Sequence, residues 1–351
     1  MPPIVKKAFR ASVAALALVA LAAIIYFGWH QIGDAATLHR TWNLGWLCAA
    51  LMCQLLVYLC IAGMFKLSLR SADTPPAFGF LLYCAFAFLF ANRSLPGPAV
   101  IGVATLVYLM RGKRIPSIDA QAVAGAFYFS DYAGFFTLIA AVSVPLFVGQ
   151  PNHAVTIAYV VAIAIIGASA VFAVFVFVVP ELPIRIVASV ASFSAHLVGR
   201  PELVGTWNVF VRESITGLHS KIVAAASSPE RLAGYFLLSL VMHLAEVSTV
   251  VFGARAAGIS LAFDAAAASY VGGNLASIVS VLPGAVGFYE AGMIGTMHVL
   301  GHLSLGDCAV CTLTYRVLSF WAPLPVVGSL LLKVSREGLH GASKQDNVSR
   351  T

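Results

Sequence analysis

The sequence predicts an all-α polytopic integral membrane protein built from two inverted repeats, each containing a broken, re-entrant helical hairpin. The prediction comes from the apolar composition, from short apolar runs around two Pro-Gly pairs, and from a constant spacing between the two halves. Of 351 residues, 60% are hydrophobic and 10% are charged, whereas soluble domains carry about 25% charged residues. Several windows stay apolar for about 20 residues, the length that spans a bilayer as a helix.

Six of these windows are predicted to be full membrane spans. They are Phe9–Gly28, Leu44–Phe65, Ala120–Val148, Ala154–Val179, Leu232–Ala254 and Ala309–Leu332. The first window is longer than the apolar region of a signal peptide, and Gly33-Asp34-Ala35 is a poor cleavage site, so we expect an uncleaved anchor helix.

Two further apolar regions are each interrupted by a proline-glycine pair. Ala77–Ala91 and Pro98–Met110 flank Pro96 and Gly97, and Phe263–Leu282 and Val286–Leu300 flank Pro283 and Gly284. Most of these pieces are short for a full crossing, and Pro-Gly pairs can turn the chain. We therefore expect a re-entrant hairpin at each site, lined by protein or a wet cavity.

The basic residues predict the orientation of the chain. Most of the 21 Lys and Arg fall in the first ten residues, just after 44–65, just after 98–110, in 180–231 and after 332. The positive-inside rule places these segments, and therefore both termini, in the cytoplasm. The net charge of +7 then reflects topology and contact with anionic lipid, and not nucleic-acid binding.

One offset relates the two halves of the chain. The Pro-Gly pairs at 96–97 and 283–284 lie 187 positions apart. Adding 187 to the first residue number of a predicted span in the first half gives a position at or near the start of a predicted span in the second half. A single crossing between the halves would invert the second, as in secondary transporters with broken helices. Residues 1–351 are thus expected to form one membrane domain. Its parts are the anchor 9–28, repeat 1 at 44–148, a connecting span at 154–179, a cytoplasmic or interfacial linker at 180–231, repeat 2 at 232–332 and a cytoplasmic tail at 333–351.

Five charged residues lie within the apolar segments, where charge is costly and indicates function. They are Arg93, Asp131, Glu246, Glu290 and Arg316. We expect Arg93 and Arg316 to bind a phosphate, because guanidinium matches its geometry, with Glu290 and Asp131 balancing them or contacting a cationic headgroup. If both hairpin tips approach the midplane, Arg93 and Glu290 should lie within ion-pair or one-headgroup reach. The alternative is that these charges only pair with one another to hold the hairpins.

His243 lies three positions before Glu246 and shares its helix face, which makes the two a candidate proton site; a packing histidine is the alternative. The Cys308-x-x-Cys311 motif lacks the second pair or histidine cluster of a metal site, and the sequence has no phosphate-binding loop. We expect no metal, cofactor or catalytic residue.

Residues 282–332 carry proline, glycine, glutamate, arginine and tryptophan at characteristic spacings: Pro283, Gly284, Gly287, Glu290, Gly301, Arg316, Trp321, Pro323 or Pro325, and Gly328. This pattern resembles the lysylphosphatidylglycerol synthase transmembrane-region family, with Ala285 standing where the family has glycine. In two-domain members, the resemblance implies a lipid flippase region beside a soluble aminoacyl-transferase domain. About 19 residues follow the last expected span here, so we expect the flippase-like module without that domain.

The sequence therefore predicts a protein of the bacterial cytoplasmic membrane that binds or translocates a lipid with a polar headgroup. Membrane lipids are the expected partners, with a homo-oligomer or a lipid-synthesis enzyme partner left open. Two alternatives are a membrane-embedded lipid or glycan transferase, using Glu290 or Glu246 as a base, and a non-catalytic assembly partner of a synthesising enzyme.

Overall fold

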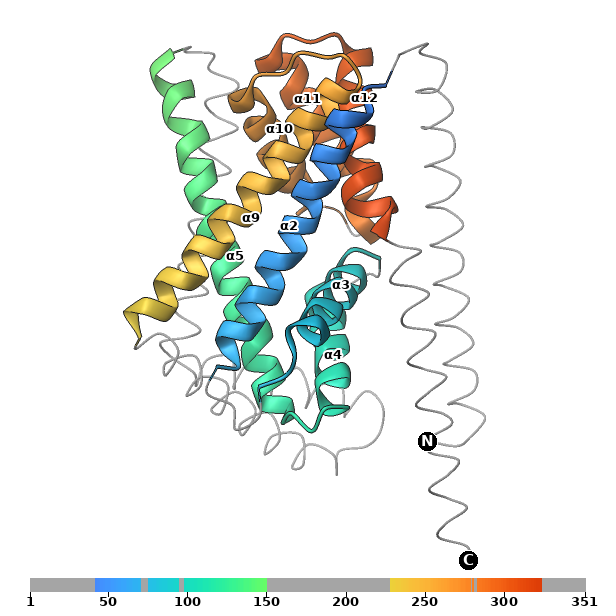
Figure 1. The fold of residues 1–351 in the computed structure, drawn as a ribbon. Helices are drawn as coiled ribbons and strands as arrows, with labels where there is room; N and C mark the ends of the chain where they lie inside the picture. Colours follow the sequence, from blue (N-terminus) through green and yellow to red (C-terminus); the bar gives the residue numbers. More distant parts are fainter. Residues whose placement is uncertain are drawn as a thin grey trace, which may run out of the picture. The chain divides into compact units, whose positions relative to one another are not determined.

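A computed structural model describes residues 42–70, 75–94, 98–149, 228–278, 280 and 283–323 of the chain, and every regular element among them is helical (Figure 1). The elements are α2 (Leu44–Ser68), α3 (Phe78–Ser94), α4 (Pro98–Arg111), α5 (Ser117–Gly149), α9 (Pro229–Ala256), α10 (Phe263–Ser277), a 3₁₀ turn (Pro283–Ala285), α11 (Phe288–Gly301), α12 (Leu305–Arg316) and a π-helical segment (Val317–Trp321). The expected anchor at 9–28, the span at 154–179, nearly all of the linker, the tail, Pro96 and Gly97 lie outside the described residues.

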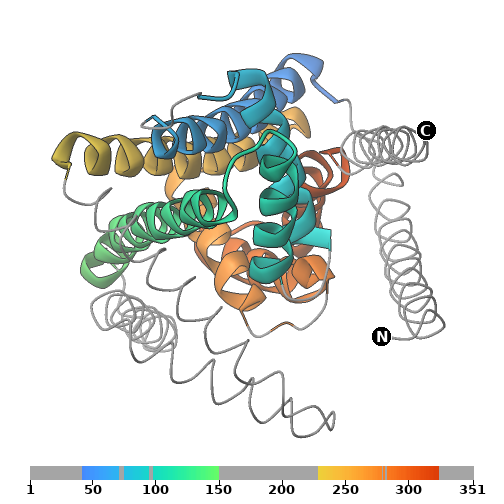
Figure 2. The same cartoon turned by 90° about the horizontal axis from the view of Figure 1, so that it is seen from below.

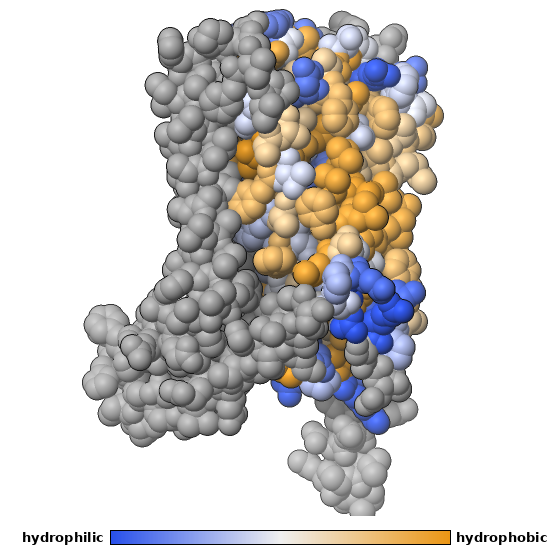
Figure 3. All heavy atoms as spheres, turned by 90° about the vertical axis from the view of Figure 1, so that its left-hand side faces the viewer, coloured by the Kyte–Doolittle hydropathy of each residue, from blue (hydrophilic) through white to orange (hydrophobic). Residues whose placement is uncertain are grey.

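Three of the described helices are long and apolar enough to cross a membrane: Leu44–Ser68, Ser117–Ser143 and Pro229–Ala256. They leave large apolar side chains exposed, among them Met52 on α2 and Leu237 on α9. On the face that it draws, Figure 3 shows hydrophobic residues over much of the coloured surface. In water such exposure would be costly, whereas in lipid it is the expected state. The prediction of an all-α polytopic membrane protein is confirmed.

The segments around the Pro-Gly pairs form short helices. α3 and α4 contain 17 and 14 residues, and α10 and α11 contain 15 and 14. At a rise of 1.5 Å per residue, such helices reach roughly 21–26 Å, less than the hydrocarbon thickness of about 30 Å. α10 ends at Ser277, five residues before the predicted end, and α11 begins at Phe288, directly after Gly287.

The described chain divides into two compact units, and both long helices α2 and α9 contribute to each. One unit comprises the described residues within Met1–Val57, Phe86–Gly102 and Leu244–Thr351; the other comprises those within Tyr58–Ala85 and Val103–His243. We call them the first and the second unit. The repeats predicted at 44–148 and 232–332 are a different division and stay a prediction.

Small residues hold α10 and α11 together in the first unit, where the two helices lie side by side (Figures 1 and 2). A Cβ atom at Gly292 would lie 2.5 Å from the Gly272 carbonyl oxygen and 2.5 Å from the Ala276 Cβ atom. The two backbones can approach this closely only because the contact residues are small, which is how membrane helices pack without a hydrophobic driving force.

In the second unit, α2, α5 and α9 pack through aromatic and small side chains. The rings of Phe65 on α2 and Phe127 on α5 meet edge to face with centroids 6.2 Å apart. The hydroxyls of Ser68 on α2 and Tyr235 on α9 lie 2.9 Å apart and share a hydrogen bond. These contacts join three segments that are distant in sequence.

The last predicted span differs from the expectation in its start and in its form. α12 begins at Leu305 because Ser304 caps it, its hydroxyl accepting from the Asp307 N–H at 3.1 Å. After Arg316 the helix widens to π geometry, in which the Ala322 N–H donates to the Val317 carbonyl at 2.8 Å. Pro323 follows and has no N–H to donate to Ser319, four residues earlier. Residues beyond Pro323 lie outside the described part of the chain.

Candidate functional site

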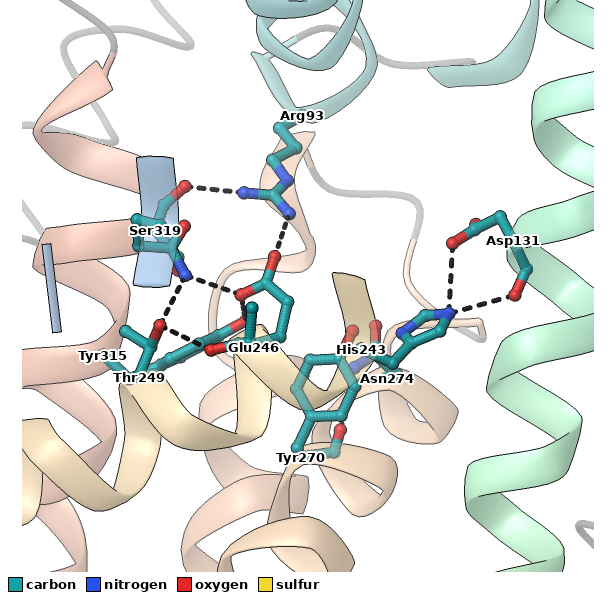
Figure 4. A network of polar contacts seen from close by, with 11 residues as sticks. Arg93, Asp131, His243, Glu246, Thr249, Tyr270, Asn274, Tyr315 and Ser319 are labelled. Carbon is teal, nitrogen blue, oxygen red and sulfur yellow. Dashed lines mark hydrogen bonds and ion pairs between the residues drawn. The ribbon is translucent and has the colours of Figure 1, made fainter. Parts of the chain in front are cut away.

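The carboxylate of Glu246 is the centre of a buried polar network in the first unit (Figure 4). Its Oε1 atom accepts from Arg93 Nη2 at 3.2 Å, and its Oε2 atom accepts from Gln54 Nε2 at 2.8 Å and from the Tyr315 hydroxyl at 2.9 Å. Glu246 is 2% exposed. A carboxylate this deep requires a cation and hydrogen bonds on both oxygens, and three other helices, α2, α3 and α12, supply them here.

Arg93 has a second partner that the sequence explains. Its Nη1 atom donates to the Ser319 carbonyl oxygen at 2.6 Å (Figure 4). In a regular α-helix that carbonyl would accept from the N–H of residue 323, but Pro323 has none. A buried carbonyl without a donor is costly, and the Arg93 guanidinium donates to this one. Arg93 therefore ties the end of α3 both to α9 and to the π-helical segment.

Glu290 is held at the start of α11 in a separate arrangement. Its Oε2 atom accepts from the Gly287 N–H at 2.6 Å, three residues earlier, which is the backbone half of a capping box. Its Oε1 atom accepts from Arg316 Nε at 2.6 Å. Gly287 has φ +88°, a conformation that glycine adopts without a steric penalty. The glycine and glutamate three positions apart thus form one local unit that begins the helix.

Arg316 joins that unit to the preceding turn. Its Nη2 atom donates to the Gly284 carbonyl at 2.8 Å, and its guanidinium lies 4.9 Å from the ring centre of Tyr289 and 4.4 Å from that of Phe320. The residue is 6% exposed. Ring faces stabilise a desolvated cation, so the two aromatic residues compensate for part of the cost of burying Arg316.

Gly284 lies where the turn meets the rest of the first unit. A Cβ atom there would lie 2.6 Å from Phe320 Cζ and 3.1 Å from the Arg93 backbone oxygen, and its φ is +64°. The end of α3, next to the first Pro-Gly pair, therefore lies against the second Pro-Gly turn. Glycine is required at 284 for both space and backbone conformation.

Asp131 and His243 belong to the second unit and contact each other. His243 Nε2 lies 3.3 Å from Asp131 Oδ1 and 3.0 Å from the Asp131 backbone oxygen (Figure 4). Asp131 is on α5 and His243 is on α9. The structure thus gives Asp131 a histidine partner and not one of the two arginines.

Besides the partner of Asp131, the structure changes two pairings expected from the sequence. Arg93 forms its ion pair with Glu246 rather than Glu290, because Glu290 caps its own helix and binds Arg316. The two members of the expected proton site, His243 and Glu246, have different partners in different units. Sequence analysis missed Gln54 and Tyr315, which carry no charge and lie far from Glu246 in sequence. Pro323 was the available signal for the carbonyl that Arg93 binds.

The family of the chain follows from its sequence. A family model described as the lysylphosphatidylglycerol synthase TM region matches residues 12–326. The chain belongs to this family. The match includes the Pro283–Glu290 motif noted in the sequence, in which the structure places Gly284 and Gly287 in the turn and Glu290 at the cap of α11. No curated protein matches the chain.

Membership of the lysylphosphatidylglycerol synthase TM-region family makes the chain an integral membrane protein connected with lipid metabolism. At Ala285, φ is +51°, so a side chain here lies in the left-handed region that costs an L-residue about 1–2 kcal/mol. Among the described residues, no group of three or more His, Cys, Asp or Glu could hold a metal ion.

Proposed function

We propose that this chain binds a membrane lipid by its polar headgroup and moves it between leaflets, with the Arg93–Glu246 pair as the headgroup site. The observation that carries the proposal is the asymmetry of that pair. The Glu246 side chain is 3% exposed, whereas the Arg93 side chain is 31% exposed. A ligand that reaches the pair meets the guanidinium first, and guanidinium binds phosphate in a fixed two-point geometry.

The charge balance of the pair indicates the kind of headgroup. A phosphate that takes Arg93 leaves the buried Glu246 carboxylate without its cation, which costs about 3–5 kcal/mol. A headgroup that also carries an ammonium group can supply that cation. We therefore propose a headgroup with both a phosphate and an amine, exchanged against the Arg93–Glu246 ion pair.

We assign the remaining charges of the first unit a supporting role. Glu290 and Arg316 bind each other, and each also binds the backbone of the turn. They keep the second Pro-Gly turn in place against the end of α3. Their substitution should therefore lower folded yield before it changes which lipid is bound.

We further propose that the membrane topology is an inverted repeat with re-entrant hairpins and cytoplasmic termini, in the bacterial cytoplasmic membrane. The helix starts support it. Moving the starts of α2, α3, α4 and α5 by 187 positions gives 231, 265, 285 and 304, while α9, α10, α11 and α12 begin at 229, 263, 288 and 305.

Labelling of single cysteines tests this topology in a background without other cysteines. Cysteines at Ser71 and Ser117 should react only from the cytoplasm, and one at Asn152 only from outside. Reaction of the first two from opposite faces would contradict both the first hairpin and the inversion.

The transferase alternative requires a carboxylate that can accept a proton from substrate. Both oxygens of Glu246 and both of Glu290 already accept hydrogen bonds, which favours binding and positioning over general-base catalysis. A transferase would also change the lipid composition in vitro, even in a sample that has no two separate membrane sides. A non-catalytic assembly partner would keep its effect when Arg93 is replaced.

Reconstituted vesicles test the proposal. Vesicles are prepared with the purified chain and a fluorescent phospholipid that has an ethanolamine headgroup, and a membrane-impermeant quencher is added. The fluorescence of the outer leaflet should be lost in a first phase. The fluorescence of the inner leaflet should be lost in a second phase, as the chain moves the lipid outward. Arg93→Gln should slow the second phase at least about tenfold, the loss expected for one charge-assisted hydrogen bond.

The matched control is Arg255→Gln. Arg255 is an exposed arginine at the end of α9 whose guanidinium lies over Trp46, so its removal should leave the rate unchanged. No second phase with the wild-type chain, or equal rates for wild type and Arg93→Gln, would contradict the proposed function.

A further inference from the structure

The two arginine–glutamate pairs of the first unit are neutral without any added proton. Arg93 pairs with Glu246, and Arg316 pairs with Glu290. Guanidinium stays protonated in proteins, so these pairs are neutral at any physiological pH. Neutrality is the requirement for groups buried at membrane depth, where a net charge is costly.

The pair in the second unit is different because its cation depends on pH. His243 lies beside Asp131 with Nε2 3.3 Å from a carboxylate oxygen. With a neutral imidazole, the pair carries one negative charge; with an imidazolium, it carries none. The Asp131–His243 pair therefore becomes neutral, like the two arginine–glutamate pairs, only when it holds an added proton.

The geometry also identifies the nitrogen that takes the proton. Nε2 faces two acceptors, the Asp131 carboxylate and the Asp131 backbone oxygen at 3.0 Å, so in the neutral ring Nε2 carries the hydrogen. The added proton then forms an N–H bond at Nδ1, and its loss returns a proton to water. No other bond changes and no electron is transferred.

The surroundings keep the imidazole in place and dry. A Cβ atom at Gly134 on α5 would collide with Ser239 Oγ and lie 3.1 Å from His243 Cδ2, so the glycine lets the two helices approach. The Phe135 ring centre lies 5.5 Å from that of the imidazole. The buried Ser239 hydroxyl, one turn from His243, has no hydrogen-bond partner among the described residues.

Among the described residues, α5 and α9 bring titratable groups near His243. Asp131 and Tyr132 come from α5, and Tyr132 is 54% exposed. Glu246 follows His243 by one turn on α9, but Arg93, Gln54 and Tyr315 hold its carboxylate. His243 is 4% exposed, whereas the Asp131 side chain is 29% exposed, so the carboxylate is the part of the pair that solvent can reach.

We propose that Asp131 and His243 form a proton-binding site, and that its proton is the coupling ion for lipid movement. The coupling, though not the proton binding, rests on the function proposed above. The site must be protonated while it is enclosed in an apolar environment, and it releases the proton when the pair, His243 included, opens to water. This is how a carboxylate–histidine pair couples a proton gradient to the movement of a second ligand.

Nitrogen NMR of the purified full chain in lipid nanodiscs, with ¹⁵N-labelled histidine, tests the binding directly. The His243 signal is identified by its absence from His243→Gln. At neutral pH it should show the doubly protonated ring in the wild type, and Asp131→Asn should lower the ratio of charged to neutral ring at least tenfold. Asp131→Glu, which keeps the charge, should retain the charged ring. A neutral His243 in the wild type, or no change in Asp131→Asn, would overturn the proposal.

The vesicle assay tests the coupling separately. A pH gradient should accelerate lipid movement by the wild-type chain, and His243→Gln should lose this acceleration, so that its rates with and without the gradient are equal. His298→Gln, at an exposed histidine bonded to the Leu303 carbonyl, is the control and should respond like the wild type. If the NMR spectrum shows a charged His243 but the rate of lipid movement does not change with the pH gradient, the coupling is refuted. If no lipid movement occurs at all, the proposed function is refuted instead.

Discussion

Replacing Gly284 by alanine should destabilise the protein strongly, although it adds one methyl group. The new Cβ atom would lie 2.6 Å from Phe320 Cζ and 2.8 Å from Phe320 Cε2, against a backbone with φ +64°. The left-handed backbone costs an L-residue about 1–2 kcal/mol, and overpacking costs typically about 1–3 kcal/mol. The sum, about 2–5 kcal/mol, would also displace the ring that covers Arg316.

Thermal unfolding of the detergent-purified protein measures this effect, with Gly295→Ala as the matched control. Gly295 lies within α11, and a Cβ atom there would meet nothing within 4 Å. Alanine in an open helix position is favoured over glycine by about 0.5–1 kcal/mol, so the control should be neutral or slightly stabilised. Adding Phe320→Leu to Gly284→Ala should recover part of the loss by making space. Equal stability of the two alanine variants would refute the account of the turn.

Three further predictions concern the same unit. Ala285→Gly removes a side chain from a backbone with φ +51° and should raise the free energy of unfolding by up to about 1 kcal/mol. Glycine substitutions usually lower stability, so a clear loss of stability here would contradict the prediction. Arg93→Ala and Glu246→Ala should each lower stability, and the double variant should deviate from additivity by about 0.5–3 kcal/mol; strict additivity would mean that the ion pair contributes nothing. Pro323→Ala supplies an N–H for the Ser319 carbonyl and should weaken the Arg93 contact, so it should slow lipid movement in vesicles without the loss of yield expected for Gly284→Ala.

The helices of this protein follow from local sequence, whereas the partners of the charged residues do not. Apolar windows located α2, α5 and α9 to within a few residues, because lipid requires backbone hydrogen bonds within each segment. Each Pro-Gly pair marked a break between short helices. The π-helical segment at Val317–Trp321 was not predicted, although Pro323, which has no N–H to donate, follows it closely.

The buried charged residues show most clearly what the local sequence cannot predict. The sequence indicated that five charged residues should be functional or paired, and the contacts of Arg93, Glu246 and Glu290 bear out the pairing. It could not indicate that Gln54, 192 positions from Glu246, would complete that carboxylate. Contacts across such distances depend on the tertiary arrangement of helices, and a local pattern carries no information about it. The capping of α11 by Glu290, three residues after Gly287, was readable in principle.

Native mass spectrometry of lipids bound to the purified chain tests the central claim most directly. If the Arg93–Glu246 pair binds a headgroup, the wild-type protein should retain phospholipid with both a phosphate and an amine, and Arg93→Gln should lose that lipid while Arg255→Gln keeps it. The same bound lipids, in the same amounts, on wild type and Arg93→Gln would contradict the account.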